Sequence, residues 1–223
     1  MKIIAHIKTD FPTKFGLPRQ SGLVKQITGK IVFEKPYRDK SAFRGLEDFS
    51  HIWLIWKFSA CDKNGWSPTV RPPLLGGNKR MGVFATRSPF RPNPIGLSCV
   101  KLEKIDFDDT YGPVLYVSGC DLMDGTPIYD IKPYLPYADS VKDAVGGFTE
   151  NLPERKLEVS IPENLLLRLD EEKLQELKGV LAGDPRPSYI DDENRIYGFA
   201  FCNKEIKFTV SGTNLTVVDI IDM

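Results

Sequence analysis

The 223-residue sequence predicts a mainly β fold, with an N-terminal β-barrel followed by a small α+β domain. Before residue 140, short runs of β-forming residues alternate with loops rich in proline and glycine, and there is hardly any helical pattern. Short strands joined by such loops favour a closed or nearly closed barrel. Near Val145 the composition shifts, and a leucine stripe at helical spacing follows. We therefore expect a barrel domain over residues 1–145 and a second domain over residues 155–223.

Alternating apolar and polar residues place the strands of the barrel in order. The predicted strands are Lys2–Lys8, Ile27–Phe33, Ser50–Phe58, Ile95–Ile105 and Val114–Cys120, followed by an extended segment after a turn at Asp124–Gly125. Ser50–Phe58 is the most hydrophobic run in the chain, and its β-forming residues predict a central strand. Trp53 and Trp56 fall on opposite faces of this strand, so one face fills the barrel and the other needs cover. A short helix capped by Ser41 is expected over Ser41–Leu46.

The second domain is predicted from one strand, one helix and three further strands. Gly146–Gly147 resembles a linker, and the helical pattern over Pro162–Leu181 is ended by Gly183 and Pro185. The predicted strands are Leu157–Ile161, Arg195–Phe201, Glu205–Val210 and Leu215–Ile221. The leucine stripe of the helix is that of an ordinary core face.

The segment Met81–Ser98, MGVFATRSPFRPNPIGLS, combines a stiff backbone with polar side chains. It opens as a predicted strand over residues 81–86, after which three prolines within six residues remove backbone donors. A stiffened loop loses less conformational entropy on binding than a flexible one. The segment carries Arg87, Ser88, Arg91 and Asn93. These polar groups favour a ligand or nucleic-acid site over a plain proline-rich turn.

Charge is unevenly distributed along the chain, although its net value is zero. Taken alone, a net charge of zero argues against a polyanionic partner. No Asp or Glu occurs between Phe11 and Phe33, or between Lys63 and Leu102, while several Lys and Arg residues occur in both segments. If the two segments lie close together, they form one basic face, which is typical of a surface that binds phosphates.

Several classes of function are disfavoured by missing motifs. The four cysteines are widely spaced without a CxxC pair, and the two histidines form no HExxH motif, so neither a metal site nor a disulfide framework is suggested. No long apolar run or signal peptide is present, so a cytoplasmic location is the default expectation. GxGxxG, P-loop and GxSxG motifs are absent. What is left is group transfer between two bound substrates, or a binding module.

The chain resembles the TsaA/YaeB-like family on strings that follow one another along nearly its whole length. These strings are GLPRQSGLV, TVRPPLLGG, GVFATRSPFRPNPIGLS, DGTPIYDIKPYLPYADS and DPRPSY. The resemblance implies a TrmO-type tRNA (adenine(37)-N6)-methyltransferase, which uses S-adenosylmethionine on a β-barrel instead of a Rossmann-like fold. It also implies a homodimer that methylates N6 of the threonylcarbamoyl-modified adenosine next to the anticodon.

The resemblance further implies which residues bind the cofactor. They are Arg19, Gln20, Ser21, Gly22, Leu23, Ser59, Ala60, Arg87, Leu97, Asp124, Gly125, Thr126 and Pro127. The tRNA is expected to meet the basic segment and the DPRPSY loop of the second domain. The residues expected to bind it are Arg71, Arg80, Arg91, Asn93, Arg186 and Tyr189.

A carboxylate is expected to take the proton that leaves adenine N6. The candidates are Asp121, Asp124, Asp130 and Asp139, and the sequence does not choose among them. Two other interpretations stay open: a non-catalytic RNA-binding barrel that uses the same basic face, and a methyltransferase that acts on a small metabolite. The DGTP motif favours an enzyme over the former, and the segregated arginines favour tRNA over the latter.

Overall fold

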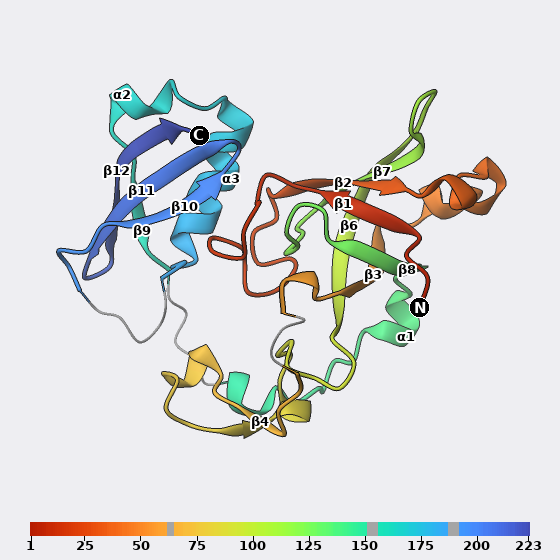
Figure 1. Ribbon diagram of the computed structural model, residues 1–223, viewed down its shortest axis with the longest axis horizontal. Coiled ribbons are helices and arrows are strands. Elements are labelled where there is room, and N and C mark those ends of the chain that lie inside the picture. The colour runs from red at the N-terminus through yellow and green to blue at the C-terminus, as the bar shows by residue number, and fades with distance from the viewer. Residues whose placement is uncertain (62–64, 151–155, 187–191) are drawn as a thin grey trace.

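The computed structural model describes residues 1–61, 65–150, 156–186 and 192–223. Six strands form a closed barrel in which every neighbouring pair is antiparallel (Figure 1). In their order around the barrel they are β1 (Ala5–Lys8), β2 (Thr28–Phe33), β7 (Gly112–Ser118), β6 (Ile95–Asp108), β3 (His51–Lys57) and β8 (Pro127–Pro133). The predicted mainly β fold with an N-terminal barrel is confirmed, and the strand Ser50–Phe58 is central, between β6 and β8.

The C-terminal unit is a four-stranded sheet with two helices. Its sheet order is β10 (Tyr197–Phe201), β11 (Lys204–Ser211), β12 (Asn214–Asp222) and β9 (Glu158–Ser160), with β9 parallel to β12. Helices α2 (Glu163–Leu166) and α3 (Glu171–Ala182) precede β10, and α3 lies between the sheet and the barrel (Figure 1). None of the helices among the described residues is long and apolar enough to span a membrane.

The prediction of a single helix over Pro162–Leu181 is wrong, because the helix is interrupted between Leu166 and Glu171. The carboxylate of Asp170 accepts the backbone N–H of Lys173 at 2.8 Å and so caps a new helix, which is the interaction that Asp favours at this position. The leucine stripe nevertheless faces the core, since Leu165, Leu174, Leu177 and Leu181 are buried.

Two local predictions in the first half of the chain are also wrong. The strand expected over residues 81–86 covers only β5 (Met81–Gly82), which pairs with β4 (Thr69–Val70), and then turns into a 3-10 helix over Val83–Ala85. The helix expected over Ser41–Leu46 is a 3-10 turn over Lys40–Phe43, capped by Asp39 instead of Ser41, and a second one over Leu46–Asp48. The remaining short helices are α1 (Pro136–Asp139) and 3-10 turns at Lys35–Tyr37, Ser59–Cys61, Pro73–Leu75 and Gly147–Thr149.

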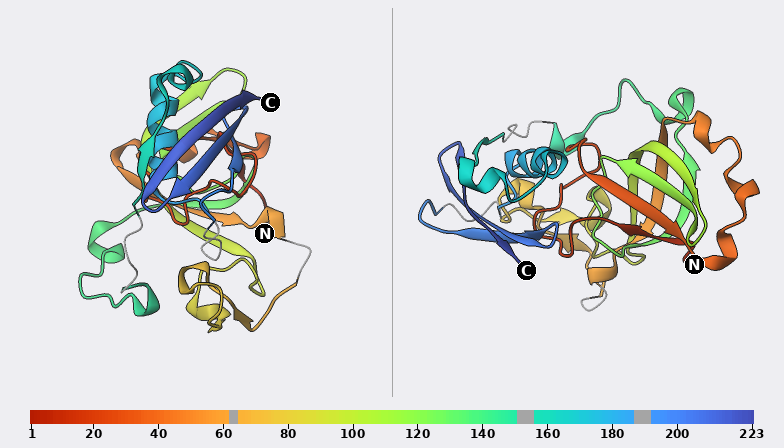
Figure 2. Two further views of the ribbon diagram at one scale, coloured as in Figure 1. Left: turned by 90° about the vertical axis from the view of Figure 1, so that its left-hand side faces the viewer. Right: turned by 90° about the horizontal axis from the view of Figure 1, so that it is seen from above.

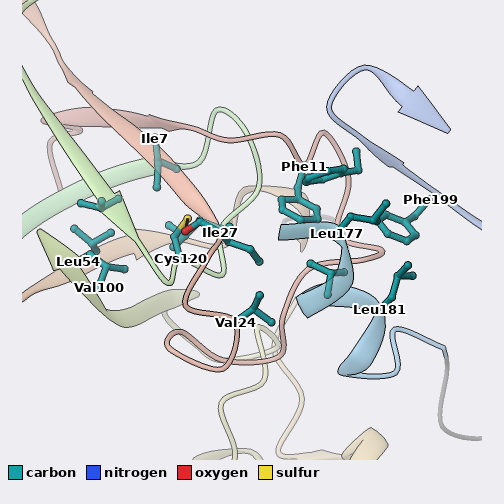
Figure 3. Close-up of a cluster of buried hydrophobic side chains, with 14 of the residues drawn as sticks. Ile7, Phe11, Val24, Ile27, Leu54, Val100, Cys120, Leu177, Leu181 and Phe199 are labelled. Atoms are coloured by element: carbon teal, nitrogen blue, oxygen red, sulfur yellow. Dashed lines mark hydrogen bonds between the residues drawn. The ribbon is translucent and has the colours of Figure 1, made fainter. Parts of the chain in front are cut away.

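Trp56 is one of the apolar residues that fill the barrel interior. Ile52, Leu54 and Trp56 of β3 point inward and are buried, while Trp53 is only partly covered, so the predicted opposite faces are confirmed. Gly96 on the paired strand β6 lets the indole lie against the backbone, because a Cβ there would be 2.2 Å from the ring. The core continues into the C-terminal unit, where Figure 3 shows Phe11 and Val24 beside residues of α3 and β10.

Three connections of the barrel leave from the same end, and the 34–50 connection between β2 and β3 lies at the other. The three are residues 9–27 between β1 and β2, residues 58–94 between β3 and β6, and residues 119–126 between β7 and β8. Since neighbouring strands are antiparallel, the chain exits and re-enters at one rim in each case. The 58–94 connection, which we call the arm, runs out from the barrel and forms the lowest part of Figure 1 and of the left panel of Figure 2.

Candidate functional site

The 9–27 connection carries the Arg19–Leu23 turn and holds it against the rim of the barrel. The backbone N–H of Gly22 donates to the carbonyl oxygen of Gly119 at 2.8 Å, and the N–H of Cys99 donates to Oγ of Ser21 at 3.2 Å. Gly22 has a φ of +79°, in the left-handed region that favours glycine. The turn therefore joins the start of β6 to the 119–126 connection.

The arm reaches the same turn through Arg87. Its Nη1 donates to Oε1 of Gln20, so the two predicted cofactor segments touch. Arg91, in contrast, serves its own loop: its Nη1 donates to the carbonyl oxygens of Thr86 at 2.6 Å and Val83 at 3.3 Å. The stiffness expected of this proline-rich segment is thus increased by an arginine that crosses it.

A chain of polar groups lies beneath the turn, starting inside the barrel. Nε1 of Trp56 donates to Oγ of Ser98 at 2.9 Å, and this hydroxyl donates to Oδ1 of Asp121 at 2.6 Å. Burial raises the pKa of Asp121, and hydrogen bonds from Ser98 and from the backbone of Ser21 partly oppose this shift. Ser98 was not singled out from the sequence. The signal for it is a polar residue at an inward position of β6, between buried Gly96 and Val100.

The outer surface of β6, β3 and β8 adjoins the turn, and we call it the outer wall. Strand register places two rows of outward residues there: Leu97, Ile55 and Asp130 in one, and Cys99, Trp53 and Lys132 in the other. Leu97 is 51% exposed. Since the backbone of Cys99 bonds to Ser21, this wall borders the Arg19–Leu23 turn.

Two of the candidate carboxylates lie on the outer wall or against it. Asp139, in α1, accepts the backbone N–H of Leu135 at 2.8 Å and Nε1 of Trp53 at 3.0 Å, and these bonds lower its pKa. Its negative charge adds to the effect of burial in raising the pKa of the Cys99 thiol. Asp130 forms an ion pair with Lys132 at 3.0 Å.

The Asp124–Pro127 turn closes over the end of β1. One carboxylate oxygen of Asp124 accepts the N–H of Thr9 at 3.1 Å, and the other lies 3.6 Å from Nζ of Lys8. Gly125 has a φ of +73° and donates to the carbonyl oxygen of Ile7 at 2.8 Å. Thr126 and Pro127 are buried. Asp124 therefore shares the rim with the Arg19–Leu23 turn, and it contacts the end of β1 and the start of the 9–27 connection.

The remaining predicted residues lie on the arm and in the C-terminal unit. Ser59 and Ala60 are exposed at the base of the arm, and the predicted site residues Arg71, Arg80 and Asn93, farther along it, are exposed as well. Nη1 of Arg80 donates to Oγ1 of Thr69 at 2.8 Å. Arg186 holds both carboxylate oxygens of Asp184, at 2.9 and 3.1 Å. Tyr189 lies outside the described residues.

Two surface pockets lie away from the outer wall. One is lined by Lys40, Phe43, Arg44, Glu47, Ile105 and Phe107, and the other by Thr13, Phe15, Gly198, Phe199, Ala200, Glu205 and Met223. Neither contains a predicted site residue. Within the described ranges, no three His, Cys, Asp or Glu side chains gather closely enough to hold a metal ion.

Comparison with known proteins gives matches over both structural units. The family model for the tRNA-methyltransferase O N-terminal domain matches residues 6–140, and that for the TrmO C-terminal domain matches residues 154–223. A tRNA (adenine(37)-N6)-methyltransferase of Escherichia coli strain K12 is 46% identical over 192 residues, which cover 83% of this chain and 81% of that protein.

Two further similarities concern a cofactor-dependent relative and a solved fold. A protein of Pseudomonas aeruginosa strain PAO1, named "Putative S-adenosylmethionine-dependent methyltransferase RcsF", is 40% identical over 203 residues, or 87% of this chain and 85% of its own. A solved structure described as the crystal structure of TrmO superposes with a TM-score of 0.80 at 32% identity, covering 98% of this chain and 97% of that one.

The partly buried carboxyl group of Asp121 should leave a signature in the pH dependence of stability. Because its pKa is raised in the folded protein, the folded state binds the proton more tightly than the unfolded state does. The free energy of unfolding should therefore fall as pH rises from about 4, the ordinary Asp pKa, to the raised pKa, and stay level above it. Asp121→Asn should remove this fall.

Urea unfolding of wild type and Asp121→Asn between pH 4 and pH 8 measures this effect. The exposed Asp109 provides the control Asp109→Asn, which makes the same change of charge. Identical pH profiles for wild type and Asp121→Asn would contradict the role of burial.

Proposed function

The chain belongs to the tRNA-methyltransferase O family, and we propose that it transfers a methyl group from S-adenosylmethionine to N6 of adenosine 37 in tRNA. The observation that carries the proposal is the meeting of three distant segments at one rim: the Arg19–Leu23 turn, Arg87 of the arm and Leu97 at the start of β6. Each contains residues expected to bind the cofactor. Their convergence beside the carboxylates of the outer wall supports a shared site for the methyl donor and the base.

The chemistry of these residues fits S-adenosylmethionine. Its carboxylate suits an exposed guanidinium such as that of Arg87, whose contact here is with the neutral side chain of Gln20. Its adenosine needs apolar cover. Leu23 and Leu97, on two segments that are joined by the bond between Ser21 and Cys99, are 68% and 51% exposed and can provide it. The positive sulfonium suits nearby carboxylates and backbone carbonyl groups. When bound, the cofactor supplies an electrophilic methyl group.

The protein must position adenine N6 and then remove a proton from it. The N6 lone pair is delocalised into the ring, so alignment with the methyl group has to provide much of the rate. After transfer N6 carries a positive charge and is strongly acidic, so a weak base is sufficient. Asp139 fits this step best, since its hydrogen bonds from Leu135 and Trp53 keep it ionised and fixed on the outer wall. Asp130 is the second choice, because Lys132 already neutralises it.

We further propose that the arm and the C-terminal unit hold the anticodon stem-loop. Arg71, Lys79 and Arg80 are exposed on the arm, whose sequence contains no acid between residues 65 and 94. A base in an RNA loop leaves its stack at little cost, so adenine N6 can reach a site that a duplex base cannot. The DPRPSY loop, with Arg186 and Tyr189, is the proposed contact of the second domain. We propose that the adenosine already carries a threonylcarbamoyl group when it is methylated. We also propose that the protein is cytoplasmic.

A homodimer is the assembly that we propose for the enzyme. Leu23 and Leu97 expose large apolar surfaces beside the outer wall, and Trp53 and Ile55 lie between them and β8. A second copy of the chain would cover this surface and enclose the cofactor. Sedimentation velocity at micromolar concentration should show a dimer. A fully active monomer would contradict the proposal.

Mass spectrometry of tRNA nucleosides tests the function directly. A strain that lacks the gene should lose the N6-methyl group from adenosine 37, and the wild-type gene should restore it. Incubation of purified protein with tRNA that either carries or lacks the threonylcarbamoyl group decides whether this group is required. An unchanged nucleoside profile in the deletion strain would reject the proposal.

Arg87→Ala should weaken binding of S-adenosylmethionine by about 1.5 to 3 kcal/mol, the usual loss for one charge-assisted hydrogen bond. Isothermal titration calorimetry on the purified variant measures it. Arg44→Ala is the matched control, since Arg44 is exposed beside a pocket away from the proposed site. Wild-type affinity in an Arg87→Ala/Asp124→Ala double variant would exclude the proposed cofactor site.

Removing two charges from the arm should weaken tRNA binding and leave S-adenosylmethionine binding unchanged. We expect Arg71→Gln/Lys79→Gln to reduce the slope of log K against log salt by up to about one per lost phosphate contact. Fluorescence anisotropy with an anticodon stem-loop at several salt concentrations gives the slope. If affinity and slope both equal those of wild type, the arm does not bind the tRNA backbone.

A further inference from the structure

The 9–27 connection is fastened to the C-terminal unit at its beginning. Lys173 of α3 places Nζ 2.7 Å from a carboxylate oxygen of Asp10, and the carbonyl oxygen of Asp10 accepts the N–H of Cys202 at 3.0 Å. The ring of Phe11 packs against that of Phe201, with centroids 5.1 Å apart. The first residues of the connection are thus held by a charge, a backbone bond and an aromatic contact.

The same helix fastens the other end of the connection. Oε1 of Glu176 accepts hydrogen bonds from Oγ1 of Thr28 at 2.9 Å and from Nζ of Lys173 at 2.7 Å. Glu176 is fully buried, and its second oxygen has no hydrogen-bond partner among the described residues. Lys173 therefore links Asp10 to Glu176, and through it the two ends of the connection.

The charges of this cluster depend on one another. Burial raises the pKa of Glu176, while its bonds with Lys173 and Thr28 act in the opposite direction. Burial alone would lower the pKa of Lys173, but hydrogen bonds to Asp10 and Glu176 outweigh it and raise the pKa. Lys173 is consequently charged at neutral pH, and its removal would leave two carboxylates without their cation.

A third contact lies directly after the Arg19–Leu23 turn. Val24 is buried against Gly179 of α3, and a Cβ built on Gly179 would be 2.6 Å from Cγ1 of Val24. Glycine is unfavourable inside a helix relative to alanine, so its presence here is explained by the close approach of the two segments. Figure 3 shows Val24 beside α3, while Leu181 projects from the other side of the helix.

We propose that α3 positions the cofactor-binding turn, so that the C-terminal unit sets the affinity for S-adenosylmethionine as well as contributing to tRNA binding. The positioning residues are Lys173, Glu176 and Gly179. This inference rests on the proposed function, because it takes the Arg19–Leu23 turn as part of the cofactor site. The connection has no regular secondary structure of its own between β1 and β2. Held in place beforehand, it loses less conformational entropy when the cofactor binds.

Gly179→Ala tests the proposal with a single added methyl group. The alanine strengthens the helix itself but pushes Val24 and the turn away, so the Kd for S-adenosylmethionine should rise about tenfold. The KM for the cofactor should rise with it, while kcat and the KM for tRNA should stay within about twofold. Adding Val24→Ala removes the clashing Cγ1 and should restore the Kd to within about threefold of wild type. Gln175→Ala, on the exposed side of the same helix, is the control.

The proposal can also be tested without measuring catalysis, by a second variant, Lys173→Met, and by hydrogen exchange. Lys173→Met should raise the Kd for the cofactor more than Lys204→Met, which removes an ion pair with Asp222 inside the C-terminal sheet. Hydrogen exchange of the Gly22 amide, which is bonded to Gly119, should be faster in both Gly179→Ala and Lys173→Met. Unchanged cofactor affinity and unchanged Gly22 exchange in these two folded variants would overturn the proposal. If the wild type itself fails to bind S-adenosylmethionine, the proposed function falls, and Gly22 exchange still tests whether α3 holds the turn.

Discussion

Closure of the six-stranded barrel determines where the segments of the proposed site leave the barrel wall. In a closed antiparallel barrel each strand reverses direction relative to its neighbours, so β1, β3 and β7 end at one rim, where β2, β6 and β8 begin. The connections 9–27, 58–94 and 119–126 must therefore leave from this rim. That is why Gln20 meets Arg87 and Thr9 meets Asp124, although these pairs are 67 and 115 residues apart.

Side chains alternate across the barrel wall, so residues that stabilise the core point inward and residues that can contact a ligand point outward. Inward positions carry the apolar core together with the chain from Trp56 through Ser98 to Asp121, which reaches the backbone of the Arg19–Leu23 turn from below. A buried polar chain of this kind is stable because each member has a partner. Outward positions of β3 and β6 carry Trp53 and Leu97, and with Asp130 of the neighbouring β8 they suit contact with a ligand or a second chain. One pair of strands thus serves both purposes.

The C-terminal unit packs against the 9–27 connection, on the side that the barrel does not cover. Residues 9–27 are too rich in proline and glycine to fold by themselves, and they lie between the rim and α3. Their apolar side chains, such as Phe11 and Val24, complete a core that is continuous between the two units (Figure 3). A turn that is supported on both sides can present polar groups at fixed positions without a regular element beneath it.

Local periodicity was enough to predict the barrel strands, the opposite faces of Trp53 and Trp56, and the stiff segment after Thr86. Its motifs also identified the family. It misjudged the break before Asp170 and the turn at Val83–Ala85, because apolar spacing continues through both while capping and pairing decide the backbone. Only the tertiary structure joined Leu97 to Asp130 across three strands, and Lys173 to Asp10 and Thr28 across two units. Strand register fixes the former neighbours, and the packing of α3 against the 9–27 connection fixes the latter. Both are long-range properties that no local pattern encodes.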